Sequence, residues 1–318
     1  MATTPFALQP RLVAISGLYT NRRLIADAVL PRVSTGGTQT FKYLLHAMED
    51  GFTIPDTRVG RASRPAQVQF SAVETSGATM DYGLDIPIPN ADVQNAQGQH
   101  DPAAQAATDP QAKATLLSTS LLMLDREVRV ANLIFTLGTY LAANRTTLSG
   151  TSQWSDFTNS NPLDAILTAM DIPVQRPNIG VIGRQAFTKL QQHPIIVSAV
   201  LGNAGSRGAV AAEAIANLLG LDQLLVGEGF LNTARPGQTL SMSRVWGKHL
   251  ALLYIDPNGG PMDMPSFGWT AEWGTRQAGT VPDPNMGVRG GEAVRVYESV
   301  AEVISAPALG YFFQNAVA

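Results

Sequence analysis

Residues 109–144 read DPQAKATLLSTSLLMLDREVRVANLIFTLGTYLAAN, a stretch with the properties of one long helix. Asp109 is a favourable N-cap residue, and Pro110 suits the first helical position because an N–H there would have no partner within the helix. Beyond Pro110 the stretch contains no proline, and Gly138 is its only glycine. These features predict a helix from 110 to 144, about 50 Å long.

Apolar residues recur along this predicted helix at alternating spacings of four and three. One stripe is formed by Leu117, Leu121, Leu124, Val128, Ala131 and Phe135. A second stripe beside it is formed by Met123, Val130, Ile134, Leu137 and Leu141. An apolar face of this breadth needs a sheet or further helices packed against it.

Four charged residues, Asp125, Arg126, Glu127 and Arg129, lie close together on the same predicted helix. Paired carboxylates can support acid–base catalysis. Alternating charges on a helix more often form a solvated or intersubunit ion-pair surface. We expect such a surface here.

Upstream of the helix, alternating apolar residues predict a β-hairpin over residues 58–88. Its first strand carries Val68 and Phe70, and its turn is expected at residues 75–77. Its return strand carries Met80, Tyr82, Leu84 and Ile86. A two-stranded hairpin is at best marginally stable alone, so the apolar face needs a partner surface in its own chain or in a neighbour.

Arg58, Arg61 and Arg64 are spaced three apart near the base of the predicted hairpin. They could bind phosphate or carboxylates. The net charge is -3 and the chain has no long basic run, which favours carboxylates of an adjacent subunit over nucleic acid. A solvated trio is an equal alternative.

The rest of the chain predicts an arm, a linker and an α/β region. Residues 1–40 contain short apolar pieces that cannot build a core alone, and the Ala- and Gln-rich residues 91–108 are typical of a linker. After residue 150 the pattern changes, with helices predicted at 162–170, 184–192 and 209–219. Strands are predicted at 178–183, 224–227, 250–255 and 293–304. The predicted class is α/β (α+β).

Composition points to a subunit whose surface is covered. Hydrophobic residues make up 45% of the 318 residues but charged residues only 15%, against about 25% in ordinary soluble chains. Copies of the chain itself are the simplest cover. There is no cysteine, which excludes disulfides and thiolate metal sites, and no apolar run is long enough for a membrane span.

We find no motif for catalysis, a cofactor or a metal. None of the four histidines lies in a zinc-binding pair, and His193, before Pro194, is expected to be a cap or surface residue. The glycine-rich residues 202–208 lack the ending of a nucleotide-binding loop and are expected to form a loop. No serine lies in a hydrolase elbow motif.

Taken in order, these segments resemble the major capsid proteins of tailed phages, whose architecture is called the HK97-like fold. Residues 26–31 resemble the end of the family's N-terminal arm, 58–88 its extended loop, and 124–127 part of its long spine helix. Later matches are residues 148–162, Val245-Trp246-Gly247, residues 265–270 and Gly310-Tyr311. The resemblance covers nearly the whole chain, although each motif alone is weak.

The resemblance implies four parts: an N-terminal arm (1–40), an extended hairpin loop (41–90), a peripheral domain (91–161 and 263–318, with a spine helix at 110–144) and an axial domain (162–262). It implies self-assembly into pentamers and hexamers of an icosahedral capsid around double-stranded DNA. Expected partners are a separate scaffolding protein, a portal and DNA by non-specific contact only, with a decoration protein as a further candidate. The expected location is the virion, after assembly in the host cytoplasm. A nanocompartment shell of the same fold stays open, as does an α/β hydrolase.

Some members of this family link subunits covalently through a lysine of the extended loop. The lysines here are Lys42, Lys113, Lys189 and Lys248, and none lies within residues 58–88. We therefore expect assembled particles to be held together without covalent links. Boiled particles on a denaturing gel should give one band near 33.8 kDa, whereas a ladder of larger species would contradict this expectation.

Overall fold

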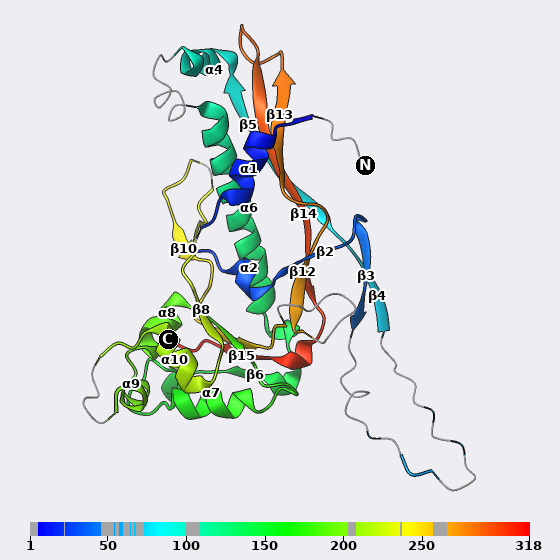
Figure 1. The fold of residues 1–318 in the computed structure, drawn as a ribbon. Coiled ribbons are helices and arrows are strands. Elements are labelled where there is room, and N and C mark those ends of the chain that lie inside the picture. Colours follow the sequence, from blue (N-terminus) through cyan, green and yellow to red (C-terminus); the bar gives the residue numbers. More distant parts are fainter. Residues whose placement is uncertain are drawn as a thin grey trace.

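The computed structural model describes residues 6–21, 23–45, 73–98, 109–202, 208–235, 237–256 and 266–318, with isolated positions between 54 and 67. Its organising element is the helix α6 (Pro110–Ile134). One sheet runs along α6, and a second sheet with its own helices lies at the lower end of α6 in Figure 1. Helices and strands are mixed, so the predicted class is confirmed.

The first sheet has the order β1-β13-β14-β12-β2, with β5 paired to the other side of β14. Strand β14 is its centre, because it pairs with β13 and β12 on one side and with the whole of β5 on the other. The long C-terminal strand predicted from the sequence is thereby confirmed. The strands are β1 (Ala7–Leu8), β2 (Arg32–Ser34), β5 (Met80–Pro89), β12 (Gly268–Glu272), β13 (Gln277–Asp283) and β14 (Gly291–Ile304).

The second sheet has the order β6-β15-β11-β7-β8. Its strands are β6 (Arg145–Thr147), β7 (Ile179–Gly183), β8 (Gln223–Gly227), β11 (Leu250–Leu253) and β15 (Gly310–Gln314). The helices beside it are α7 (Pro162–Met170), α8 (Arg184–Leu190), α9 (Pro194–Leu201) and α10 (Ala212–Leu219).

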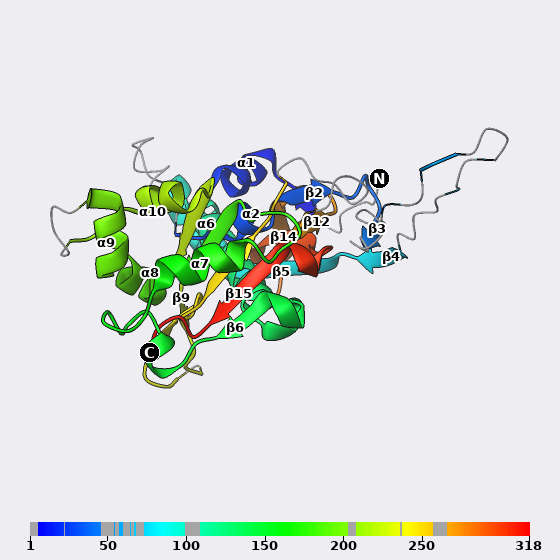
Figure 2. The ribbon, with the colours of Figure 1, turned by 90° about the horizontal axis from the view of Figure 1, so that it is seen from below.

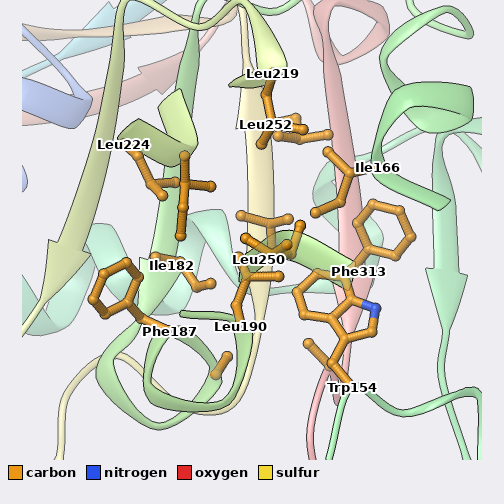
Figure 3. Close-up of a cluster of buried hydrophobic side chains, with 14 of the residues drawn as sticks. Trp154, Ile166, Ile182, Phe187, Leu190, Leu219, Leu224, Leu250, Leu252 and Phe313 are labelled. Carbon is orange, nitrogen blue, oxygen red and sulfur yellow. The ribbon is translucent and has the colours of Figure 1, made fainter. Parts of the chain in front are cut away.

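Figure 3 shows the core of this second unit, where Trp154, Ile166, Phe187 and Phe313 point into one buried cluster. Trp154 and Phe313 lie outside the predicted axial range of 162–262, as do strands β6 and β15. The boundaries of that range are therefore corrected: residues 145–156 and 310–318 pack with the second sheet. Sequence order could not reveal this, because the chain returns to the second sheet only after completing the first.

The remaining elements are short. They are α1 (Pro10–Leu18), α2 (Ala26–Val29), α4 (Asn90–Gln97), the ribbon strands β3 (Thr40–Leu45) and β4 (Val73–Ala78), the pair β9 (Phe230–Asn232) and β10 (Met242–Arg244), and the 3-10 turns η1 (Leu137–Thr139), η2 (Ala142–Asn144), η3 (Gly150–Ser152) and η5 (Pro307–Leu309). Helix α4 occupies the start of the predicted linker and buries Ala96. Among the described residues, no helix has the length and apolar character needed to cross a membrane.

Helix α6 begins as predicted but ends ten residues early. The Asp109 carboxylate accepts hydrogen bonds from the N–H groups of Gln111 and Ala112, which confirms the cap. At the other end, the hydroxyls of Thr139 and Tyr140 donate to the carbonyls of Leu133 and Ile134. These side chains satisfy the last carbonyls, so the helix ends at Ile134.

The buried face of α6 also differs from the prediction. Leu117 and Leu121, from the first apolar stripe, are 56% and 45% exposed. Val130, Ala131 and Ile134 of the predicted stripes are buried as expected. The rest of the buried face is formed by Ala114, Thr115, Ser118, Thr119, Leu122, Arg126 and Glu127. Much of this face is polar, and it can be buried because partners from the arm and the sheet reach it.

The junction between β7 and α8 generates a stability prediction. A Cβ atom added at Gly183 would lie 1.8 Å from the carbonyl oxygen of Gly247. Gly183→Ala must therefore displace backbone and should destabilise the subunit by about 3 kcal/mol or more. Gly17→Ala in helix α1 is the matched control, because nothing lies within 4 Å of a Cβ there and helix propensity favours alanine. Chemical denaturation of both variants tests this, and equal effects would contradict it.

Candidate assembly surfaces

Strands β3 and β4 form an antiparallel ribbon that belongs to neither large sheet. Residues 75–77 lie within β4, so the turn predicted there is wrong. Gly77 is opposite Phe41, and a Cβ atom at Gly77 would lie 2.6 Å from the Phe41 ring. The glycine thus provides room for an aromatic ring and does not form a turn.

The ribbon is attached to the body by aromatic contacts at its root. The ring centroid of Phe41 lies 5.5 Å from that of Trp269 on β12, and that of Tyr43 lies 6.2 Å from Trp269. Beyond this root the ribbon extends away from α6 and the second sheet (Figures 1 and 2). Among the described residues, its strands pair only with each other.

The return strand of the predicted hairpin does not belong to the β3–β4 ribbon. Met80, Tyr82, Leu84 and Ile86 lie on β5, which pairs with β14 of the same chain. Tyr82 and Ile86 pack against the core between α6 and the first sheet, whereas Met80 and Leu84 are 66% and 38% exposed. The partner surface that the sequence required is therefore, for this strand, the chain's own sheet.

The other predicted contact residues are only partly covered by the structure. Arg58 and Arg64 are exposed. Arg61, Val68 and Phe70 lie outside the described residues.

Glu127 is fully buried where the arm, helix α6 and the second unit meet. Its carboxylate accepts hydrogen bonds from the backbone N–H groups of Ile25 and Ala26, at 3.0 and 2.8 Å. The indole N–H of Trp246 donates to it as well. Burial raises the pKa of Glu127 above its ordinary value, against the opposing effect of these donors.

Arg126, the preceding residue, holds the arm from the other side. The residue is 1% exposed, and its guanidinium donates to the carbonyl of Leu30, to the hydroxyl of Thr270 and to the carboxylate of Asp27. Burial lowers the pKa of Arg126. Arg126 and Glu127 thus fasten residues 25–30 to α6, and the prediction of a solvated or intersubunit surface is wrong for both.

Asp125 and Arg129 agree better with the predicted solvated ion-pair surface. They form an ion pair one helical turn apart, with the Asp125 side chain 55% exposed. Arg129 also binds Glu302 at 3.0 Å and lies 3.6 Å from the ring centroid of Tyr82. These contacts are within one subunit.

Further ion pairs join the arm to the first sheet. Arg32 binds Asp27, Glu272 and Glu298, and Arg276 binds Glu298 as well. Burial raises the pKa of Glu298, but Arg32 and Arg276 outweigh burial and bring it below the ordinary value. The sequence carried no signal for this cluster, because bonded partners within it lie up to 266 positions apart.

Groups that could support other chemistry have structural roles. The described residues contain no cluster of side chains suited to a metal ion. His193 is fully buried, with Nδ1 accepting from the N–H of Ile195 and Nε2 lying 3.1 Å from the Ser160 hydroxyl. It caps α9, as one of the two expectations had it, and burial lowers its pKa.

Comparison with known proteins identifies the family. No family model matches the chain. The chain is 47% identical to the major capsid protein of Pseudomonas phage JBD67 over 318 residues, which cover both chains completely. The chain belongs to the major capsid proteins of phages. It is also 24% identical over 277 residues to the major capsid protein of Burkholderia phage BcepMu, covering 83% of this chain and 82% of that one.

Solved structures of a phage-related protein and of a phage capsid have the same fold. A phage-related protein from Bordetella bronchiseptica matches with a TM-score of 0.72 at 20% identity, covering 98% of both chains. The capsid structure of cyanophage P-SCSP1u matches with a TM-score of 0.55 at 9% identity, covering 99% of this chain and 90% of that one. The predicted HK97-like fold is confirmed, and the chain is a structural subunit of a phage capsid.

The Glu127 junction generates a second stability prediction. In Glu127→Gln the side chain loses its charge and turns an amide N–H₂ toward groups that are themselves donors. We expect a loss of about 2–4 kcal/mol in the free energy of unfolding.

Asp125→Asn is the matched control, since it makes the same change two residues away at an exposed ion pair. It should change stability by no more than about 0.5 kcal/mol. Denaturant titration of the unassembled subunits compares the two. Equal losses, or none for Glu127→Gln, would show that the junction is not held by this carboxylate.

Proposed function

We propose that this subunit assembles with copies of itself, as pentamers and hexamers, into the icosahedral shell of a tailed phage. The observation that carries the proposal is the β3–β4 ribbon. It is held to its own body at an aromatic root and extends away from both sheets. A two-stranded ribbon is at best marginally stable alone, so a surface on a neighbouring copy is its natural support.

The shell encloses double-stranded DNA and works without catalysis. Its relatives are structural capsid proteins, and the buried charged side chains Arg126, Glu127 and Glu298 bind the arm to α6 and the first sheet. The net charge of -3 suits a container that does not condense its contents, because binding through phosphates requires an excess of lysine and arginine. DNA contact is then weak and non-specific.

Assembly takes place in the host cytoplasm with a separate scaffolding protein and a portal, and the mature shell offers an outer surface to a decoration protein. A nanocompartment shell is the alternative use of the same fold. Nucleic acid in purified particles supports the phage capsid, and enclosed protein without nucleic acid contradicts it.

The register of β3 and β4 defines a clean loop replacement. Leu45 is paired with Val73, so a four-residue Gly/Ser turn in place of residues 46–72 can close the ribbon without disturbing either sheet. We expect a soluble subunit with near-native circular dichroism and a cooperative melt that forms no particles in electron micrographs.

A Gly/Ser segment of the original length is the control. It should also fail to assemble if the residues of the loop make the contacts, and it should assemble if the loop is only a tether. Particles formed by the shortened chain would overturn the proposed role of the loop.

A further inference from the structure

The last residues of the chain are held against the start of strand β11. The N–H of Asn315 donates to Nδ1 of His249 at 2.9 Å, and the N–H of Ala316 donates to the carbonyl of Lys248 at 2.8 Å. The side chain of Ala316 is fully buried in the core of the second unit. Residues 315–318, which we call the C-terminal tail, are therefore part of that core.

The tail also holds the segment that leads into the second unit. The carbonyl of Ala316 accepts from the N–H of Trp154 at 2.8 Å, and the N–H of Ala318 donates to the Ser155 hydroxyl at 3.2 Å. Trp154 is 1% exposed and packs beside Phe313 of β15 (Figure 3). Release of the tail would therefore open the edge of this core at Trp154.

His249 lies where three elements meet. Its ring centroid is 5.3 Å from that of Phe135, at the end of α6, and 5.6 Å from that of Phe312 on β15. Its Nδ1 binds the tail. The hydrogen bond of this imidazole thus joins the tail to the place where α6 reaches the second unit.

The hydrogen bond from Asn315 requires a neutral imidazole. A backbone N–H can only donate, so Nδ1 of His249 must carry a lone pair, and the proton of the neutral ring is on Nε2. In the protonated ring both nitrogens are donors, and the Asn315 N–H would face a second N–H. The rings of Phe135 and Phe312 can attract a cation, but neither offers a lone pair to the Asn315 N–H. Protonation of His249 therefore breaks this bond.

The surroundings of His249 oppose a positive charge. Burial and then the charge of Lys248 lower the pKa of His249 below its ordinary value. From α6 and β15 the ring is faced by phenylalanines, which do not titrate. Among the described residues, no carboxylate forms an ion pair with His249. Since the folded-state pKa is lowered, the contact is fully present above the ordinary pKa of about 6.5 and is lost as the pH falls below it.

We propose that His249 is a pH-sensitive switch that holds the C-terminal tail in place at neutral pH and releases it in weak acid. Release separates residues 315–318 from His249 and Trp154, while the strands of the second sheet stay paired. The joint between α6 and the second unit is then firm at neutral pH and looser in acid. The switch lies within one folded subunit, so it goes beyond the proposed function and does not depend on assembly.

Hydrogen–deuterium exchange of the folded subunit tests this switch. Exchange is compared at about pH 7.5 and about pH 5.5, on either side of the ordinary pKa of histidine, after correction for the intrinsic effect of pH. Peptides covering the tail and Trp154 should exchange several-fold faster at the lower pH. Peptides covering β7 should stay protected at both. No acceleration in the tail, or equal acceleration in β7, would overturn the switch.

Two variants of His249 separate the hydrogen bond from the packing of the ring. His249→Asn places an amide oxygen where Nδ1 lies, so it can accept the Asn315 N–H but cannot titrate. His249→Phe keeps an aromatic ring and offers no acceptor. We expect a protected tail at both pH values for the first variant and an exchanging tail at both for the second. A tail whose exchange still depends on pH in either variant would overturn the role of His249.

His193 provides the matched control. Its Nδ1 also accepts a backbone N–H, that of Ile195 at 3.3 Å, and burial lowers its pKa as well. Asparagine is a favourable N-cap residue, so His193→Asn removes this second titration without removing the cap of α9. The tail should keep its full pH dependence in this variant. If the dependence disappears, release of the tail follows protonation of His193, and the assignment to His249 is wrong.

Discussion

The carboxylate of Glu127 is the interaction on which the arrangement of this subunit depends. It is fully buried and binds backbone N–H groups of the arm and the indole N–H of Trp246. A buried carboxylate without such donors would be strongly destabilising. The arm, α6 and the loop before β11 must therefore come together for any of them to be stable in this position.

This requirement explains why α6 buries a polar face. Arg126 fixes the other end of the same arm segment through Asp27 and the Leu30 carbonyl. Farther along, the Thr119 hydroxyl bonds to Ser16 of α1. The buried Thr119, Arg126 and Glu127 of the helix are thus bound to groups of the arm, and the arm serves as a structural part of the subunit core.

The elements of the subunit differ in how far they are bound within their own chain. The arm is fastened within its own chain, and β5 is paired along its whole length with β14. The β3–β4 ribbon has only its aromatic root, and Glu298 keeps one buried oxygen without a partner among the described residues. A subunit whose arm is bound internally and whose ribbon is weakly supported is suited to contacts with neighbouring copies.

The sequence by itself determined the start of α6, the long strand β14 and the order of elements that resembles a phage capsid protein. In the second unit it determined α7, α8, α10, β7, β8 and β11, but not α9, β6 or β15. These features follow from local preferences, such as the cap at Asp109 and the alternation along residues 293–304. Only the tertiary structure decided which face of α6 is buried. Hydropathy predicts that Leu117 is buried and Arg126 is exposed, and the structure shows the reverse. It also decided that β4 pairs with β3 and not with β5. The physical reason is the same in both cases, because the free energy of burying a side chain or of pairing a strand depends on distant partners. The arm residue that binds Glu127 lies about 100 positions away in the sequence, and the strand that pairs with β5 lies more than 200 positions away. The periodicity of a segment carries no information about them.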